Sequence, residues 1–278
     1  MMLFNVFFIT CLIITALAVA RQKWSEKHHR QHSLHGIEGV MLFIGLIKST
    51  QQHRGMHSGL LNGKLEFKEK LPPIELIISD YYTKILKFEK SHIYPESLSI
   101  YTPSKQWQLF IKNNAINSAE SFRVHSRLIA RQLDALWDMS DEFSLTSNNQ
   151  LNIRHLAQQL IQTLPELTEA LGQIRALTVQ VASKQVMSAD KKLQILFTLG
   201  KIEEHHQNLI TPVPEETNKK LITFIDMIKQ NTHNGFLSRK KPDQLFQDST
   251  EVIDALFIFI QTGLDSLKIA IKTGKIDT

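Results

Sequence analysis

The sequence predicts an all-α protein in which an N-terminal transmembrane helix is followed by antiparallel helical bundles, about eight helices in two four-helix-bundle-like parts. Apolar residues recur at spacings of three and four along most of the chain after residue 35. Strand-like alternation is scarce, and Gly and Pro are concentrated between long segments. At 278 residues, the chain can bury a sizeable core in one domain or in two small ones.

The first segment, residues 2–20, is uncharged and almost wholly apolar. Its length is about that needed to cross a hydrocarbon core of ~30 Å. We therefore expect a transmembrane anchor and basic juxtamembrane segment over residues 1–30 and a helical sensor domain over residues 31–278. Ala18-Val19-Ala20 also has the form of a signal peptidase site, so a cleaved export signal remains the alternative for this segment.

Charge around this segment predicts its orientation. Only the amino terminus is basic before it, whereas four basic side chains follow it directly: Arg21, Lys23, Lys27 and Arg30. Because basic flanks stay in the cytoplasm, we expect a single-pass protein of the bacterial inner membrane with a cytoplasmic sensor domain.

Helix-like periodicity and Gly or Pro breaks place the remaining elements. We expect helices over residues 36–61, 73–90, 103–114, 118–146, 152–184, 188–210, 215–231 and 244–272. The breaks between them fall at Asn62-Gly63, Pro72-Pro73, Tyr94-Pro95, Ser147-Asn148-Asn149, residues 211–214 and residues 235–242. Pro165 should bend or interrupt the helix that contains it, because proline lacks a backbone donor and clashes with the preceding turn.

Composition excludes several functional classes. The formal net charge of +5 is mild and spread along the chain, and no stripe of Lys and Arg interleaved with aromatics indicates a nucleic-acid partner. With Cys11 as the only cysteine, the sequence predicts neither a disulfide framework nor a thiolate metal site. We expect no metal and no cofactor.

The helix expected over residues 36–61 carries a polar patch on its apolar stripe. The stripe is formed by Ile37, Met41, Ile44 and Ile47, and the same count continues to Gln51, Arg54, Ser58 and Leu61. Gly55 and Gly59 lower helix propensity by roughly 1 kcal/mol each relative to Ala, yet they open room for a neighbouring helix or a small ligand.

A second patch lies in the helix expected over residues 152–184. Its stripe of Leu160, Leu164, Leu167 and Leu171 is followed by Arg175 and Thr178, with Gly172 allowing close approach. The two patches therefore share a Gly, an Arg and a hydroxyl within two turns. A third helix contributes His125 to its own apolar stripe.

These patches resemble the nitrate- and nitrite-sensing (NIT) domain family. The segment Gln51-x-x-Arg54-Gly55 resembles the family's first motif, although His53 stands where the family commonly has Glu. Residues 164–177, built around Gly172-x-x-Arg175, are similar to its second motif. The pattern Phe246-x-x-x-Thr250-x-x-x-Asp254 is similar to a weaker one in the last helix.

The resemblance covers residues 36–272 and implies an all-helical sensor of two bundles, with a small anion bound between helices by arginines. Arg54 and Arg175 match the two motif arginines. The planar guanidinium fork suits a planar oxyanion, and an anion would relieve the repulsion between two such groups. The predicted ligand-binding residues are Arg54, Arg175, Gln51, Ser58, Gly55, Thr178 and His125.

No kinase, chemotaxis, cyclase or RNA-binding output part is visible, so the resemblance implies signalling through a separate, unidentified protein. A homodimer fits this class of bundle. The predicted partners are thus a nitrate-like or nitrite-like oxyanion, the bilayer through residues 2–20, and a signalling protein.

A structural scaffold for protein–protein interaction, without a ligand, is the alternative. In that case a carboxylate from Glu166, Glu169 or Asp254 would pair with each arginine, and His125 would be a satisfied core histidine. An enzyme is not expected. His53 and His57 have the spacing of two zinc ligands, but Arg54 stands where such a motif supplies its general base.

Overall fold

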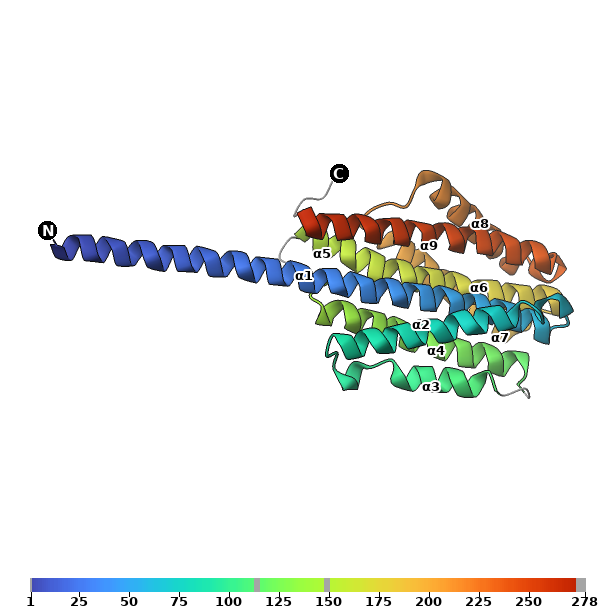
Figure 1. The fold of residues 1–278 in the computed structure, drawn as a ribbon. Coiled ribbons are helices and arrows are strands. Elements are labelled where there is room, and N and C mark those ends of the chain that lie inside the picture. The colour runs from blue at the N-terminus through green and yellow to red at the C-terminus, as the bar shows by residue number, and fades with distance from the viewer. Residues whose placement is uncertain (1, 113–115, 148–150, 274–278) are drawn as a thin grey trace.

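The computed structural model describes residues 2–112, 116–147 and 151–273, with the side chains of residues 2–11 and 151 outside that description. All regular elements in these ranges are helical, so the all-α prediction is confirmed (Figure 1). The α-helices are α1 (Met2–Leu61), α2 (Leu71–Ser91), α3 (Tyr101–Phe110), α4 (Ser118–Glu142), α5 (Leu151–Gln158), α6 (Leu164–Lys184), α7 (Ala189–Gln207), α8 (Glu215–His233) and α9 (Pro242–Thr273). Short 3₁₀ helices span Leu65–Phe67, Glu96–Leu98 and Phe236–Arg239.

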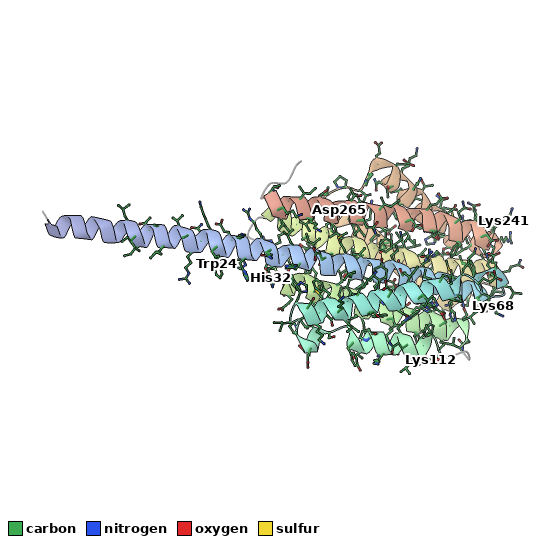
Figure 2. All side chains as sticks on the ribbon, in the orientation of Figure 1. Trp24, His32, Lys68, Lys112, Lys241 and Asp265 are labelled. Carbon is green, nitrogen blue, oxygen red and sulfur yellow. The ribbon has the colours of Figure 1, made fainter. Side chains whose placement is uncertain are left out.

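Helix α1 is one continuous helix of 60 residues rather than an anchor and a separate helix that begins at residue 36. The first proline of the chain is Pro72, so no residue before Leu61 forces the backbone out of a helix. The N-terminal half of α1 projects beyond the bundle (Figure 1). Trp24 lies on this projecting part and is 71% exposed, whereas side chains become buried from Ser33 onward (Figure 2).

The predicted membrane-spanning helix over residues 2–20 is contradicted. In the ranges that the structure describes, no helix has a stretch long and apolar enough to cross a bilayer. The bilayer contact predicted through residues 2–20 is therefore not supported by the described residues.

Several helix ends follow local signals. Asn117 caps α4 by accepting a hydrogen bond from the Glu120 backbone N–H, and Ser188 caps α7 in the same way. Prolines occupy the first turn of α2. Gly63 turns the chain after α1 with a φ of 96°. The predicted break at Asn148-Asn149, the end of the third helix at residue 114 and the Cys11 side chain lie outside the described residues.

The helix predicted over residues 152–184 is interrupted, as Pro165 indicated. Residues Gln159–Thr163 form a π-helical turn between α5 and α6, and Pro165 is in the first turn of α6. Since proline offers no backbone N–H and crowds the carbonyl one turn earlier, the wider turn accommodates it without breaking the helix axis. Helix α6 can then present a long face to α1.

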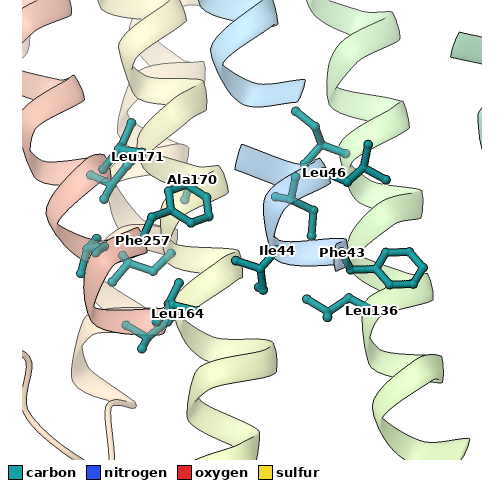
Figure 3. Packing of buried hydrophobic residues seen from close by; sticks show 14 of the residues in the cluster. Phe43, Ile44, Leu46, Leu136, Leu164, Ala170, Leu171 and Phe257 are labelled. Carbon is teal, nitrogen blue, oxygen red and sulfur yellow. The ribbon is translucent and has the colours of Figure 1, made fainter. Parts of the chain in front are cut away.

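The hydrophobic core surrounds α1. This helix packs against α2 and α4 on one side and against α6 and α9 on the other, while α6 also packs against α7 and α9. Figure 3 shows Phe43 of α1 beside Leu136 of α4, with Ile44 on the side toward Leu164 of α6 and Phe257 of α9. Burial of these apolar stripes fixes the rotation of α1 and therefore which of its polar residues face α6.

Candidate functional site

The two predicted arginines meet at the interface of α1 and α6, each facing a glycine of the other helix. Arg54 is 1% exposed and Arg175 is 4% exposed. A Cβ atom at Gly172 of α6 would lie 2.5 Å from Arg54 Nη2, and one at Gly55 of α1 would lie 3.4 Å from Arg175 Nη2. The two Gly-Arg patches are therefore complementary, because each glycine leaves space for the opposite guanidinium.

Arg54 forms a two-pronged ion pair with Glu169 of α6. Its Nη1 donates to Glu169 Oε1 at 2.6 Å, and its Nη2 donates to Oε2 at 3.0 Å. Nη1 also donates to the Ser126 hydroxyl of α4 at 3.1 Å, and the Phe122 ring lies against the guanidinium, 5.5 Å from centroid to Cζ. The Gln173 amide donates to Glu169 Oε1 at 2.8 Å. For Arg54, the structure thus matches the internal ion pair of the scaffold alternative.

Arg175 is different, because no carboxylate of the described residues pairs with it. Its Nη1 donates to the Thr250 hydroxyl of α9 at 3.0 Å, and its Nη2 donates to the backbone carbonyl of Gln51 at 3.1 Å. The Phe246 ring lies 5.1 Å from its Cζ. Burial, and then the nearby charge of Arg54, lower the pKa of Arg175 to about 10, so the group remains charged at neutral pH but poorly compensated.

Unpaired polar atoms gather at the same place. Within the described parts of the chain, Arg175 Nε and both side-chain polar atoms of Gln51 are buried without a hydrogen-bond partner. The Gln51 amide oxygen lies close to Arg54, since it would be 3.6 Å from a Cβ atom at Gly172. Buried polar groups are normally paired, so unpaired N–H donors at a guanidinium that lacks a carboxylate partner favour an acceptor-rich anion.

The side chains of three other predicted ligand residues make their contacts elsewhere than at the Arg175 guanidinium. The Thr178 hydroxyl donates to backbone carbonyls of its own helix, to Ile174 at 2.8 Å and to Arg175 at 3.3 Å. Ser58 lines a separate cavity of about 350 Å³ between α1, α4, α6 and α7. His125 is fully buried in a histidine cluster between α1 and α4. Their positions on an apolar stripe did not reveal which neighbouring helix each side chain faces.

The sequence predicted some of the residues that contact the two arginines, but not which arginine each one contacts. Glu169 was one of three candidate carboxylates, whereas Asp254 pairs with Lys48 at 3.3 Å. Thr250 and Phe246, from the weak pattern in the last helix, both contact Arg175. Ser126 carried no recognisable signal, because a single serine on an amphipathic helix has no distinctive spacing.

Replacing Gly172 with alanine should disturb this interface. Its methyl group would meet Arg54 Nη2 at 2.5 Å and force the guanidinium away from Glu169. We expect the free energy of unfolding to fall by about 2 kcal/mol, the typical cost of overpacking, in urea denaturation followed by circular dichroism. Gly200→Ala in α7 is the matched control, because nothing lies within 4 Å of its Cβ position. That change should stabilise the helix by up to about 1 kcal/mol, and an equal loss in both variants would contradict the interpretation.

The comparisons with known proteins support the fold. No family model matches the chain, and no curated protein matches it. Among solved structures, it is similar to the "Structure of the NasR transcription antiterminator", with a TM-score of 0.68 and 13% sequence identity over 93% of this chain and 74% of that chain. The protein therefore shares the helical fold of that transcription antiterminator.

Proposed function

We propose that this protein senses a small oxyanion, such as nitrate or nitrite, that binds beside Arg175 between α1 and α6. The main support is the buried guanidinium of Arg175, which pairs with no carboxylate of the described residues, together with the unpaired N–H groups of Arg175 and Gln51. An oxyanion brings a negative charge and only acceptor atoms, which is what this set of donors lacks. The sequence resemblance to the NIT family suggests which oxyanions to test.

Binding in this place would couple to helix movement. Both guanidinium groups are almost fully buried, so an ion that reaches them has to shift α1 relative to α6. Once bound, it would attract both arginines and compete with Glu169 for Arg54. A ligand that favours one arrangement of two packed helices shifts the population toward it, and a partner protein can read that change.

Isothermal titration of the full chain with nitrate and nitrite tests the proposal, with chloride and sulfate as comparison anions. We expect binding of the planar oxyanions. In Arg175→Lys, which keeps a positive charge but loses Nε–H and the planar fork, the affinity should fall at least about tenfold. Arg131→Lys is the matched control, because Arg131 is exposed on α4 and should leave the affinity unchanged.

The scaffold alternative makes the opposite prediction. It is favoured by the Arg54–Glu169 ion pair, which already neutralises one of the two arginines. If none of the four anions produces heat of binding or raises the melting temperature, the arginines are internal structural groups and the sensor proposal is wrong.

A further inference from the structure

A chain of buried polar contacts joins α1, α2 and α4 through side chains that the oxyanion site does not use. Glu75 Oε1 of α2 lies 3.2 Å from His53 Nε2 of α1. His53 Nδ1 lies 2.7 Å from His125 Nε2 of α4, and His125 Nδ1 lies 2.8 Å from the Ser121 backbone carbonyl. These contacts define a relay, Glu75–His53–His125–Ser121, with three junctions.

The relay is closed off by the elements around it. His53 is 1% exposed and His125 is fully buried, whereas the Glu75 side chain is 30% exposed. From α3, the Trp107 and Phe110 rings approach His53 edge-on, with centroids at 5.0 and 6.2 Å. The charged and titratable groups that face the two relay histidines are Glu75 on α2 and His57 and Arg54 on α1.

Counting hydrogens shows that neutral rings cannot complete this relay. A carboxylate and a backbone carbonyl only accept hydrogen bonds, and a neutral imidazole contributes one N–H. Two neutral histidines can therefore fill only two of the three junctions, whatever their tautomers, and two lone pairs then face each other at the third. The Ser121 hydroxyl does not supply the missing hydrogen, because it lies 3.4 Å from His125 Nδ1 but 2.7 Å from His57 Nδ1.

We propose that the relay is a proton-binding site, in which His53 carries an additional proton at neutral pH as an imidazolium paired with the Glu75 carboxylate. Imidazole is the stronger base of the two groups, and the exposed part of Glu75 keeps its carboxylate hydrated. His53 then donates to Glu75 and to His125, and His125 donates to the Ser121 carbonyl. Each of the three junctions then contains one hydrogen bond, and these bonds connect α1 to both α2 and α4.

Neighbouring groups fit a charged His53. Burial, followed by the charge of His53, lowers the pKa of His57 to about 4, and burial holds the pKa of His125 well below its ordinary value. Both rings therefore stay neutral at pH 7. The described residues contain no group of three or more His, Cys, Asp or Glu side chains arranged to hold a metal ion.

The neutral histidines around the relay make the stability of the fold depend on pH on the acid side. As pH falls from about 6.5 toward 4, unfolding lets His57 and His125 take up protons that the folded state does not bind, so stability falls.

Long-range ¹H–¹⁵N spectra of the full chain, labelled with ¹⁵N-histidine, test the proposal at pH 7. Both ring nitrogens of His53 should be protonated, and His125 should be the neutral Nδ1–H tautomer. If His53 shows only one protonated nitrogen in the folded protein, the proposal is overturned. This measurement needs no variant.

Glu75→Gln provides the matched test, because its amide can donate a hydrogen to His53 Nε2 and complete the relay with two neutral rings. We expect His53 to become neutral at pH 7. In the same long-range spectra, His53 of this variant should show one protonated ring nitrogen instead of two. Two protonated ring nitrogens on His53 in a folded Glu75→Gln variant would contradict the proposal.

Discussion

Glu169→Gln should lower the free energy of unfolding by about 3 kcal/mol in the absence of anions, the largest loss we expect from a single change in this protein. Glu169 is the only carboxylate that pairs with Arg54 in the described residues, and both side chains are more than nine-tenths buried. The amide keeps an acceptor for Arg54 but removes the negative charge, which leaves the guanidinium uncompensated in a low-dielectric interface.

Nitrate should then restore much of this stability if the interface is an anion site. A ligand present at 100 times its dissociation constant stabilises the folded state by about 2.7 kcal/mol, so the effect is large enough to measure by urea unfolding with and without nitrate. Glu166→Gln is the matched control, because that carboxylate lies three residues earlier on α6 and is 38% exposed. A Glu169→Gln variant that is destabilised but insensitive to nitrate would support the scaffold alternative.

Arg175→Met should have the opposite effect on stability. Methionine keeps much of the length of the side chain and removes a buried charge that no carboxylate of the described residues pairs with. The groups left behind remain bonded: the Thr250 hydroxyl donates to the Phe246 carbonyl at 2.6 Å, and the Gln51 carbonyl lies within the hydrogen-bonded ladder of α1. Replacing a buried ion by an apolar side chain is often stabilising, so we expect a gain of about 1 to 2 kcal/mol.

The same variant should no longer bind nitrate in isothermal titration, so stability and binding would change in opposite directions. Such a result identifies a group kept for its ligand at a cost to the fold. Arg131→Met, on the exposed face of α4, should change neither quantity appreciably. A loss of several kcal/mol in Arg175→Met would instead show that the guanidinium is a structural element.

Much of the helical architecture was predictable from residues that act locally. Apolar residues at helical spacing predicted where the helices lie, and Pro165 predicted the interruption that the structure shows as a π-helical turn. The start of the first helix at residue 36 was predicted wrongly, because a change from an apolar segment to a polar one does not by itself end a helix, and α1 continues through Gly36.

The candidate site was predictable in part, for a different reason. Gly55 and Gly172 beside the arginines indicated close helix approach, and the structure places each glycine against the opposite arginine. The partner of Arg54 could not be chosen among three carboxylates, since that choice depends on the register between helices. The histidine relay was not predictable from the sequence, because its groups come from three helices and their proximity also depends on the register between those helices.

The continuity of α1 makes it a lever arm. From Arg54 to the outer part of the helix at Leu12 is about 63 Å at 1.5 Å per residue. For a stiff rod of this length, a tilt of one degree at the arginines moves the outer end by about 1 Å. The displacement increases in proportion to the tilt angle. A protein bound to the outer end would therefore be displaced much farther than the side chains at the arginines, even when the tilt is too small to repack the core.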